Sequence, residues 1–283
     1  MIRLVAIDMD GTLLRPDGHI SERNVRAVEA MQKAGTEFLV CTGRSCIDAM
    51  EPLREAGLRA SVVCMNGAAV YDWNGRLIDE NRMSEGQVRE ILSCCRGEDI
   101  IFDFMTDKGS YTTADEAWFK ACFERNVLLP MSEYTYEGVK GRFHFTGEEE
   151  LFHQGLAFYK ISVIHETQKV LGRIKERLAG VTELAVASSF ATNLELTHVC
   201  AQKGRALAAY AAARGIGPDE IMAIGDSEND YSMLSMDLKY TVAMGNAMES
   251  IKRVAKCQTR SNVQDGVAYA IETLVLAKEA RAY

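Results

Sequence analysis

The sequence lacks a long apolar run, an excess of basic residues and a leader-like N-terminus. No apolar stretch reaches the roughly 18 residues of a membrane-spanning helix, and no small-residue cleavage pattern follows an apolar N-terminal segment. We therefore expect a cytoplasmic protein that does not use a membrane. The net charge of -8, with 32 Lys and Arg against 40 Asp and Glu, has the wrong sign for binding a phosphate backbone. A nucleic-acid partner is thus excluded, and a small-molecule partner is expected.

Cysteine and histidine are present, but not in the patterns of a disulfide framework or a zinc site. The eight cysteines include no Cys-x-x-Cys pair, and disulfide scaffolds are typical of short secreted chains. We expect reduced thiols, mainly in the core. The segment from His165 ends in Lys169, where a zinc protease helix has its second histidine. A zinc site is therefore not expected.

The chain of 283 residues, 47% hydrophobic and 25% charged, has enough apolar material for two modest domains. Near-continuous apolar strands are predicted in the first part, separated by amphipathic helices, and the same alternation returns after residue 203. This pattern is typical of a parallel sheet buried on both faces. The predicted strands are 2–7, 37–41, 61–65, 221–224 and 240–243, with a hairpin of two short segments, 68–72 and 76–80, joined across Asn74-Gly75. The predicted helices are 21–33, 45–55, 203–214, 228–235, 248–254 and one from 266 onward.

In residues 83–195 the regular alternation of strands and helices gives way to longer segments in which predicted helices and strands are mixed. We predict helices at 85–95, 115–124 and 167–178, and strands at 100–105, 142–146 and 156–164. The fold class is therefore α/β: a doubly wound, Rossmann-like parallel-sheet core with an inserted α+β domain. The core would comprise residues 1–82 and 196–283, and the insertion residues 83–195.

An acidic motif, Asp8-Met9-Asp10-Gly11-Thr12, follows directly on the first predicted strand. Open α/β sheets bind ligands at the carboxyl ends of their strands. Two carboxylates spaced i and i+2 in extended chain point to the same side, and Gly11 gives the backbone freedom for a sharp turn. An ordinary acidic β-turn is the alternative interpretation of this motif on its own.

Two further polar motifs occupy comparable positions. Thr42-Gly43-Arg44 ends the second predicted strand, where a hydroxyl, backbone N–H groups and a helix N-terminus suit a phosphate. Lys203 opens a helix, where a cation is mildly unfavourable against the helix dipole, so a nearby anion would explain it. Taken singly, a Thr-Gly loop and a solvated lysine are the alternatives.

The fourth motif, Gly225-Asp226-Ser227-Glu228-Asn229-Asp230, lies between an apolar strand and a helix. Its acids can simply cap the helix and compensate its dipole. Four polar clusters at neighbouring strand ends of one sheet make coincidence a poor explanation. Hydroxyl, cation and carboxylates would then converge on one site.

In combination these motifs resemble those of the haloacid dehalogenase superfamily of phosphatases, within it the Cof-type group with a large α+β cap. The resemblance covers both core segments; the insertion matches only in size and location. Weaker matches are Asn66-Gly67-Ala68, Ala243-Met244-Gly245-Asn246-Ala247 and Asp265-Gly266-Val267-Ala268. Asp237-Leu238 departs from the family, which often has Ala-Gly there, and no catalytic role depends on it.

The resemblance implies an Mg²⁺-dependent phosphatase that hydrolyses small phosphorylated metabolites, such as sugar phosphates or esters like flavin mononucleotide and pyridoxal phosphate. Asp8 would be the nucleophile that forms an aspartyl phosphate, and Asp10 the general acid and base. Mg²⁺ would bind the carboxylates of Asp8 and Asp226 and the backbone carbonyl of Asp10. The cap would set specificity. The phosphate would be bound by Met9 through its backbone and by Thr42, Gly43, Arg44, Lys203 and Asn229.

Three other functions share part of this pattern. A phosphohexomutase shares the fold and the aspartate pair, and the sequence discriminates poorly against it. A receiver-like phosphoacceptor module is the non-enzyme alternative, but Asp10 beside the nucleophile would promote turnover, whereas a signalling domain must store its phosphoryl group. A serine hydrolase is suggested by Gly225-Asp226-Ser227, yet no histidine follows His198 to act as its base.

Overall fold

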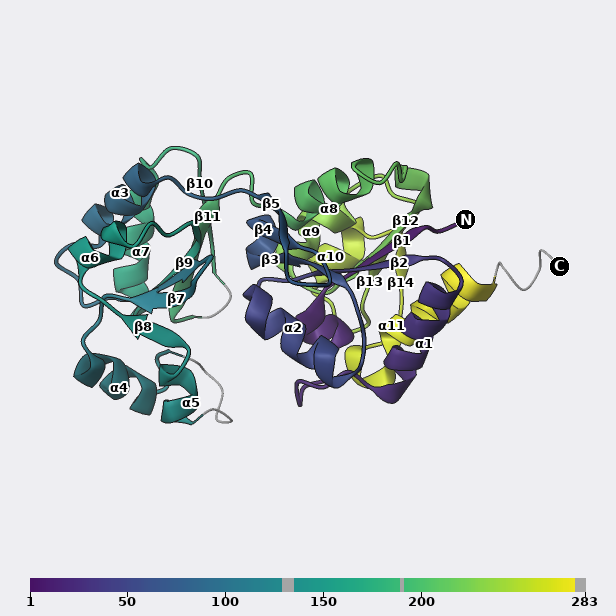
Figure 1. The fold of residues 1–283 in the computed structure, drawn as a ribbon, viewed down its shortest axis with the longest axis horizontal. Coiled ribbons are helices and arrows are strands. Elements are labelled where there is room, and N and C mark those ends of the chain that lie inside the picture. Colours follow the sequence, from purple (N-terminus) through teal and green to yellow (C-terminus); the bar gives the residue numbers. More distant parts are fainter. Residues whose placement is uncertain (129–134, 189–190, 278–283) are drawn as a thin grey trace. The chain divides into compact units, whose positions relative to one another are not determined.

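The computed structural model describes residues 1–128, 135–188 and 191–277. The chain forms two compact units, one of Met1–Glu80 with Ala201–Tyr283 and one of Asn81–Cys200 (Figure 1). The sequence placed the junctions at 82/83 and 195/196. The second junction lies five residues later in the structure because the last strand of the inserted unit runs to His198.

The first unit is built on an eight-stranded sheet in the order β14-β13-β12-β1-β2-β3-β4-β5. Each adjacent pair from β14 to β3 is parallel, whereas the pairs β3–β4 and β4–β5 are antiparallel. This is the doubly wound, Rossmann-like core that the sequence predicted. The strands are β1 (Leu4–Ile7), β2 (Glu37–Cys41), β3 (Ser61–Cys64), β4 (Ala69–Tyr71), β5 (Leu77–Glu80), β12 (Ile221–Gly225), β13 (Tyr240–Ala243) and β14 (Cys257–Gln258).

Helices cover both faces of this sheet, with α1, α2 and α11 on one side and α8, α9 and α10 on the other (Figure 1). The hydroxyl oxygen of Ser21 accepts a hydrogen bond from the Asn24 backbone N–H at 3.2 Å, so Ser21 is the N-cap that the sequence indicated. The helices are α1 (Glu22–Lys33), α2 (Cys46–Glu55), α8 (Lys203–Ala212), α9 (Tyr231–Leu234), α10 (Glu249–Val254) and α11 (Gly266–Ala270), with helical turns at Met9–Leu13, Met65–Gly67, Pro218–Glu220, Glu228–Asp230, Asn262–Gln264 and Ile271–Leu276.

The second unit has a six-stranded sheet in the order β10-β11-β9-β6-β7-β8, antiparallel except for the β7–β8 pair. Its strands are β6 (Ile101–Thr106), β7 (Gly109–Thr112), β8 (Phe143–Phe145), β9 (Phe158–Ile164), β10 (Leu184–Ala187) and β11 (Asn193–His198). Its helices are α3 (Glu85–Cys95), α4 (Glu116–Glu124), α5 (Tyr136–Lys140), α6 (Glu148–His153) and α7 (Gln168–Leu178).

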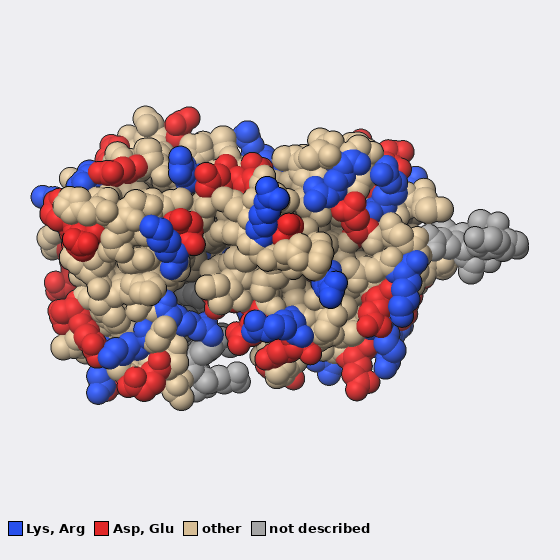
Figure 2. All heavy atoms as spheres, in the orientation of Figure 1, with Lys and Arg blue, Asp and Glu red and all other residues tan. Residues whose placement is uncertain are grey.

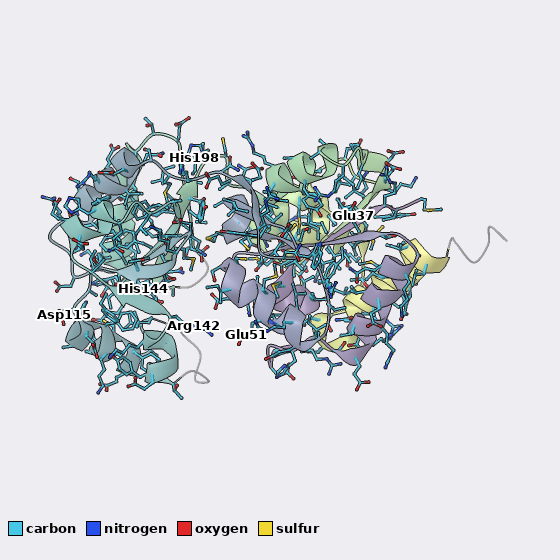
Figure 3. All side chains as sticks on the ribbon, in the orientation of Figure 1. Glu37, Glu51, Asp115, Arg142, His144 and His198 are labelled. Carbon is cyan, nitrogen blue, oxygen red and sulfur yellow. The ribbon has the colours of Figure 1, made fainter. Side chains whose placement is uncertain are left out.

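Two apolar clusters hold this unit together. One joins α3, α6 and α7 to the sheet through residues such as Phe104 and Ile161, and the other joins α4 and α5 to Ile101 and Ile164. Asp115 caps α4 by accepting from the Trp118 backbone N–H at 2.8 Å, and the His144 ring of β8 lies 4.8 Å from that of Tyr111 (Figure 3).

The predicted elements are present, most of them with ends within two residues of the observed ones, but several short ones were missed: β7, β10, β11, β14, α5 and α6. A period-2 alternation at Leu194 and Leu196 marks β11 and could have revealed it. The predicted helix 228–235 is a helical turn followed by the short α9, and the helix from Gly266 is described only to residue 277.

On the face in view, acidic and basic side chains are interspersed over the surface of each unit (Figure 2). All eight cysteines are free thiols, and Cys41, Cys64, Cys95 and Cys122 are buried. Among the described residues, no helix combines the length and the apolar character that crossing a bilayer demands.

Candidate active site

Three turns meet at the carboxyl edge of the parallel sheet. Asp8 follows β1, Thr42 follows β2 and Asp226 follows β12. Because β1 pairs with β12 on one side and with β2 on the other, these strand ends are neighbours. The convergence inferred from the sequence thus has its structural basis in the strand order.

The turn after β1 depends on Gly11. Its φ of +75° is the left-handed conformation that favours glycine, and a Cβ there would lie 2.4 Å from Asp226 Oδ2. The Asn246 side-chain amide donates to the Gly11 carbonyl at 2.8 Å, and Asn246 Oδ1 accepts from the Asn262 backbone N–H at 2.9 Å. Gly11 therefore allows the first motif and the fourth motif, which holds Asp226, to approach each other closely.

Lys203 lies at the centre of the buried charges. Its Nζ donates to Asp8 Oδ1 and to Asp230 Oδ1, both at 2.7 Å, and its side chain is fully buried. The anionic partner expected for a lysine at a helix N-terminus is thus a pair of carboxylates. Gly204 lets α8 pack tightly, because a Cβ there would lie 2.1 Å from the Ser232 carbonyl oxygen.

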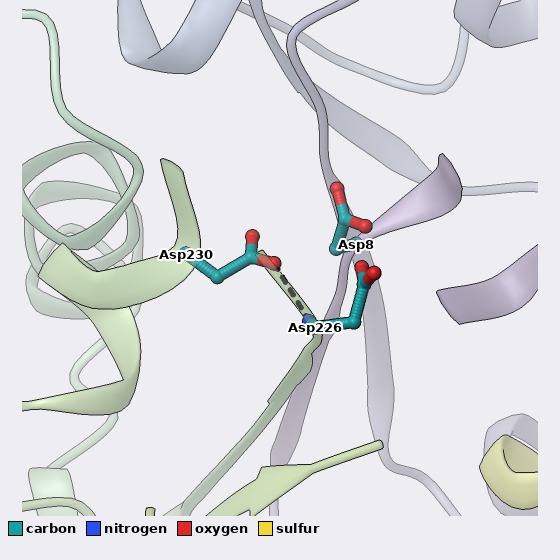
Figure 4. A group of neighbouring side chains, drawn as sticks. All are labelled: Asp8, Asp226 and Asp230. Atoms are coloured by element: carbon teal, nitrogen blue, oxygen red, sulfur yellow. Dashed lines mark hydrogen bonds between the residues drawn. The ribbon is translucent and has the colours of Figure 1, made fainter. Parts of the chain in front are cut away.

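Asp230 organises the turn that carries Asp226. Its Oδ2 accepts from the backbone N–H groups of Asp226 at 2.9 Å and Ser227 at 3.1 Å, while Thr12 Oγ1 donates to Asp226 Oδ1 at 3.0 Å (Figure 4). Asp230 was not among the predicted site residues. Its signal was present, since it closes the fourth motif, but an acid at the start of a helix is also typical of capping.

Burial raises the pKa of the Asp8 carboxyl well above its usual range, with Asp230 adding to the effect and Lys203 opposing it. Burial, followed by the charge of Asp230, raises the pKa of Asp226 to about 6. Burial disfavours the charged form of Lys203, yet Asp230 and Asp8 hold its pKa above the ordinary value. One buried lysine therefore faces three carboxyl groups, and a further cation would relieve the remaining repulsion.

Carboxylate oxygens of Asp8, Asp226 and Asp230 lie within 4.8 Å of one another, close enough to hold a metal ion (Figure 4). An all-oxygen donor set suits a hard divalent cation. Asp230 already binds Lys203 and two backbone N–H groups, which leaves Asp8 and Asp226 as the better-placed carboxylates. The side chain of Asp10 is directed to Arg44, so only its backbone carbonyl is left as a candidate ligand from this residue.

Asp10 and Arg44 form a bidentate ion pair: Nη2 lies 2.6 Å from Oδ1, and Nε lies 2.9 Å from Oδ2. The Thr42 hydroxyl oxygen accepts from the Arg44 backbone N–H at 3.1 Å. Arg44, predicted as a phosphate ligand, thus binds the carboxylate of a second predicted site residue.

The remaining predicted residues lie around this centre. Asn229 donates through its amide to Asn66 Oδ1 at 3.2 Å, and a Cβ on Gly43 would lie 3.0 Å from the same oxygen. Met9 is buried, so its backbone rather than its side chain is available to a ligand. The structure therefore places all predicted site residues in one unit, around the same sheet edge.

A doubly wound sheet with an acidic, lysine-containing centre at its carboxyl edge places this chain among α/β proteins whose site suits phosphoryl chemistry. Residues 5–271 match the family model of haloacid dehalogenase-like hydrolases. The chain belongs to this family, and the resemblance inferred from the motifs is confirmed. It is a phosphatase that hydrolyses phosphate esters.

Individual relatives agree with this assignment. Phosphatase YwpJ of Bacillus subtilis is 32% identical, over 97% of this chain and all of the relative. The 5-amino-6-(5-phospho-D-ribitylamino)uracil phosphatase YwtE of the same organism is 31% identical, over 97% of this chain and 98% of the relative. A solved haloacid dehalogenase-like hydrolase from B. subtilis, 31% identical, superposes with a TM-score of 0.81 over 97% of this chain and 100% of that one.

Proposed function

We propose that this protein is an Mg²⁺-dependent phosphomonoesterase that hydrolyses small phosphorylated metabolites through an aspartyl phosphate on Asp8. The observation that carries the proposal is the 2.7 Å contact between Asp8 Oδ1 and the buried Nζ of Lys203. A carboxylate nucleophile must approach a phosphate dianion, and a fixed cation beside it lowers the repulsion between them.

Asp8 attacks phosphorus through a carboxylate oxygen, and the leaving oxygen takes the bonding electron pair. Asp10 donates a proton to that oxygen, then accepts one from the water that hydrolyses the acyl phosphate. Arg44 is a positioning residue in this scheme, since its two contacts with Asp10 set the direction of the carboxyl group. Phosphate leaves after the second step, and Asp8 is regenerated.

Mg²⁺ would be held by the carboxylates of Asp8 and Asp226 and by the Asp10 backbone carbonyl, and when bound it neutralises negative charge on the phosphoryl group. Asp230 has a positioning role, because it binds both Lys203 and the backbone of the Asp226 turn. Thr12 fixes one oxygen of Asp226 and leaves the other for the ion.

The phosphoryl oxygens are bound by the Thr42 hydroxyl, the backbone N–H groups of Met9 and Gly43, the Asn229 amide and Lys203. The substrate class is the phosphate ester of a small metabolite, in line with the activity for which relative YwtE is named. We assign the choice among such esters to the inserted domain, residues 83–195.

The test is metal dependence together with two variants. Chelation should abolish phosphate release from p-nitrophenyl phosphate, and added Mg²⁺ should restore it. Asp8→Asn should be inactive, whereas Ser227→Ala, which changes a neighbour of Asp226, should retain most activity. Full activity in EDTA, or an active Asp8→Asn variant, would refute the proposal. Incubation with a hexose phosphate separates hydrolysis, which frees phosphate, from isomerisation by a mutase.

A further inference from the structure

The turn that follows β3, Met65–Gly67, has a left-handed backbone at three successive residues. The φ values are +50° at Met65, +59° at Asn66 and +105° at Gly67. Glycine adopts this conformation without strain and asparagine tolerates it, but a long side chain such as that of Met65 is strained in it. Strained backbone persists only where the surrounding structure holds it, and it is concentrated at functional sites. The conformation of this turn therefore points to a role beyond chain reversal.

A hydrogen bond and close packing tie the turn to two segments of the candidate active site. The Asn66 backbone N–H donates to the Thr42 carbonyl at 3.0 Å. At the next residue, a Cβ on Gly67 would lie 2.6 Å from the backbone carbonyl of Gln202, the residue that precedes Lys203. The backbone of Asn66 is thus fixed to the segments that carry the hydroxyl and the cation of the site.

The side chain of Asn66 contacts Asn229. Asn66 Oδ1 accepts a hydrogen bond from Asn229 Nδ2 at 3.2 Å, and the Ser227 hydroxyl donates to Asn229 Oδ1 at 2.8 Å. A hydroxyl can donate or accept, so the contact with Ser227 fits either orientation of the amide, whereas an amide oxygen only accepts. Asn66 therefore determines that the nitrogen end of the Asn229 amide is the one directed toward it.

The nitrogen of Asn229 lies close to a second proposed phosphate ligand. Asn229 is exposed, and its Nδ2 would lie 3.7 Å from a Cβ on Gly43, whose backbone N–H is a proposed ligand of the phosphoryl oxygens. An amide nitrogen carries two protons, and the one that is not directed at Asn66 suits an anionic oxygen.

We propose that Asn66 is a positioning residue of the phosphatase, which holds the Asn229 amide with its nitrogen toward the phosphoryl group. Asn229 Nδ2 donates one proton to Asn66 Oδ1 and the other to a phosphoryl oxygen. Without Asn66 the amide can turn over, and its oxygen, which repels an anion, then faces the ligand part of the time. This role rests on the function proposed above, because it requires Asn229 to bind the phosphoryl group, whereas the contact between the two amides does not.

Asn66→Gly separates this role from a role in the backbone alone. Glycine adopts the left-handed conformation without strain but lacks the amide oxygen, so a residue that served only the turn could be replaced without loss. We expect kcat/KM on p-nitrophenyl phosphate to fall about tenfold, with a parallel rise in KM and in the inhibition constant of inorganic phosphate, because a hydrogen bond to a charged group is misdirected. A partly unfolded variant would instead lose kcat and keep both constants.

Asn126→Gly is the matched control, since Asn126 also has a left-handed φ, +57°, but follows α4 in the second unit. It should keep the kinetics of wild type. The double variant Asn66→Gly/Asn229→Ala should be no worse than Asn229→Ala, because Asn66 acts through that amide. Wild-type constants in Asn66→Gly, or losses that add in the double variant, would overturn the proposal and leave the function proposed above standing.

Proton–nitrogen correlation NMR tests the same role without catalysis. The side-chain amide signal of Asn229, identified by its loss in Asn229→Ala, should shift in Asn66→Gly and stay in place in Asn126→Gly. With Mg²⁺ present, inorganic phosphate should move this signal in wild type at an about tenfold lower concentration than in Asn66→Gly. Equal titrations of the two proteins would overturn the proposal. A wild type that binds phosphate in this way but hydrolyses no ester would refute only the function proposed above.

Discussion

Lys203 Nζ and Asp8 Oδ1 lie 2.7 Å apart although 195 residues separate them in the chain. The lysine is fully buried and also binds Asp230, so it compensates two carboxylates inside the protein. This contact should affect both catalysis and stability. The lysine lies beside the proposed nucleophile, and burying these charges costs desolvation free energy that only their pairing offsets.

Lys203→Met should damage both properties. Removing one partner of a buried ion pair leaves uncompensated charge, which costs about 3–5 kcal/mol of unfolding free energy. Loss of the cation should also lower kcat by roughly 10²-fold or more. Urea denaturation and steady-state kinetics measure the two effects. Lys256→Met, which removes a lysine paired with fully exposed Asp237, should leave both nearly unchanged; a similar loss in this control would contradict a specific role for Lys203.

The pKa of Asp226, raised to about 6 mainly by burial, predicts how stability depends on pH without metal. A carboxyl whose pKa is raised on folding stabilises the fold while it is protonated, and this contribution is lost as pH rises from about 4 through about 6. Relative to Asp226→Asn, metal-free wild type should therefore lose on the order of 2–3 kcal/mol over this range. Denaturation in EDTA at several pH values measures the difference.

Mg²⁺ should offset the loss of stability that wild type shows at high pH. Metal binds the ionised carboxylate, so at pH 7.5 added Mg²⁺ should raise the unfolding free energy of wild type, and that of Asp226→Asn much less. Parallel pH profiles of the two proteins in EDTA, or equal stabilisation by Mg²⁺, would show that Asp226 is not the titrating ligand.

Asp10→Asn should discriminate between leaving groups. An alkoxide must be protonated as its bond to phosphorus breaks, whereas nitrophenolate leaves without help, so the loss on alkyl phosphates should reach about 10²–10⁴-fold and be much smaller on p-nitrophenyl phosphate. The variant should also accumulate phosphorylated Asp8, visible by intact-mass measurement after a rapid quench. Equal losses on both esters without a covalent species would assign the acid to another residue.

Gly11→Ala and Gly75→Ala distinguish two effects of an added Cβ. One is the strain of a left-handed backbone, and the other is a steric clash with Asp226. Both glycines have similar positive φ, +75° and +78°, but a Cβ at residue 11 would lie 2.4 Å from Asp226 Oδ2, whereas residue 75 has open space. Each variant should lose about 1 kcal/mol or more of unfolding free energy from the left-handed conformation. Only Gly11→Ala should also weaken Mg²⁺ activation, measured as the Mg²⁺ concentration for half-maximal rate; an equal shift in Gly75→Ala would contradict this assignment.

The local sequence determined the class of the core fold and the edge of the sheet at which the site lies. Apolar strands such as Leu4–Ile7 and Ile221–Gly225, separated by capped amphipathic helices, predict the doubly wound sheet, because burial on both faces imposes that pattern over a few residues. The polar motifs after these strands predict a site at the carboxyl edge, since parallel strands bring their ends together. Short elements such as β7 and α5 were missed, because an element of only a few residues is too short to show a clear hydrophobic period.

Only the tertiary structure decided which charged groups pair. Arg44 binds Asp10 across 34 residues, and Asp230 binds both Lys203 and the Asp226 backbone, although Arg44 was expected to bind phosphate and Asp230 had no assigned role. Strand alternation and helix periodicity act over a few residues, whereas the partner of a side chain depends on strand order and helix packing, which bring together residues distant in the chain.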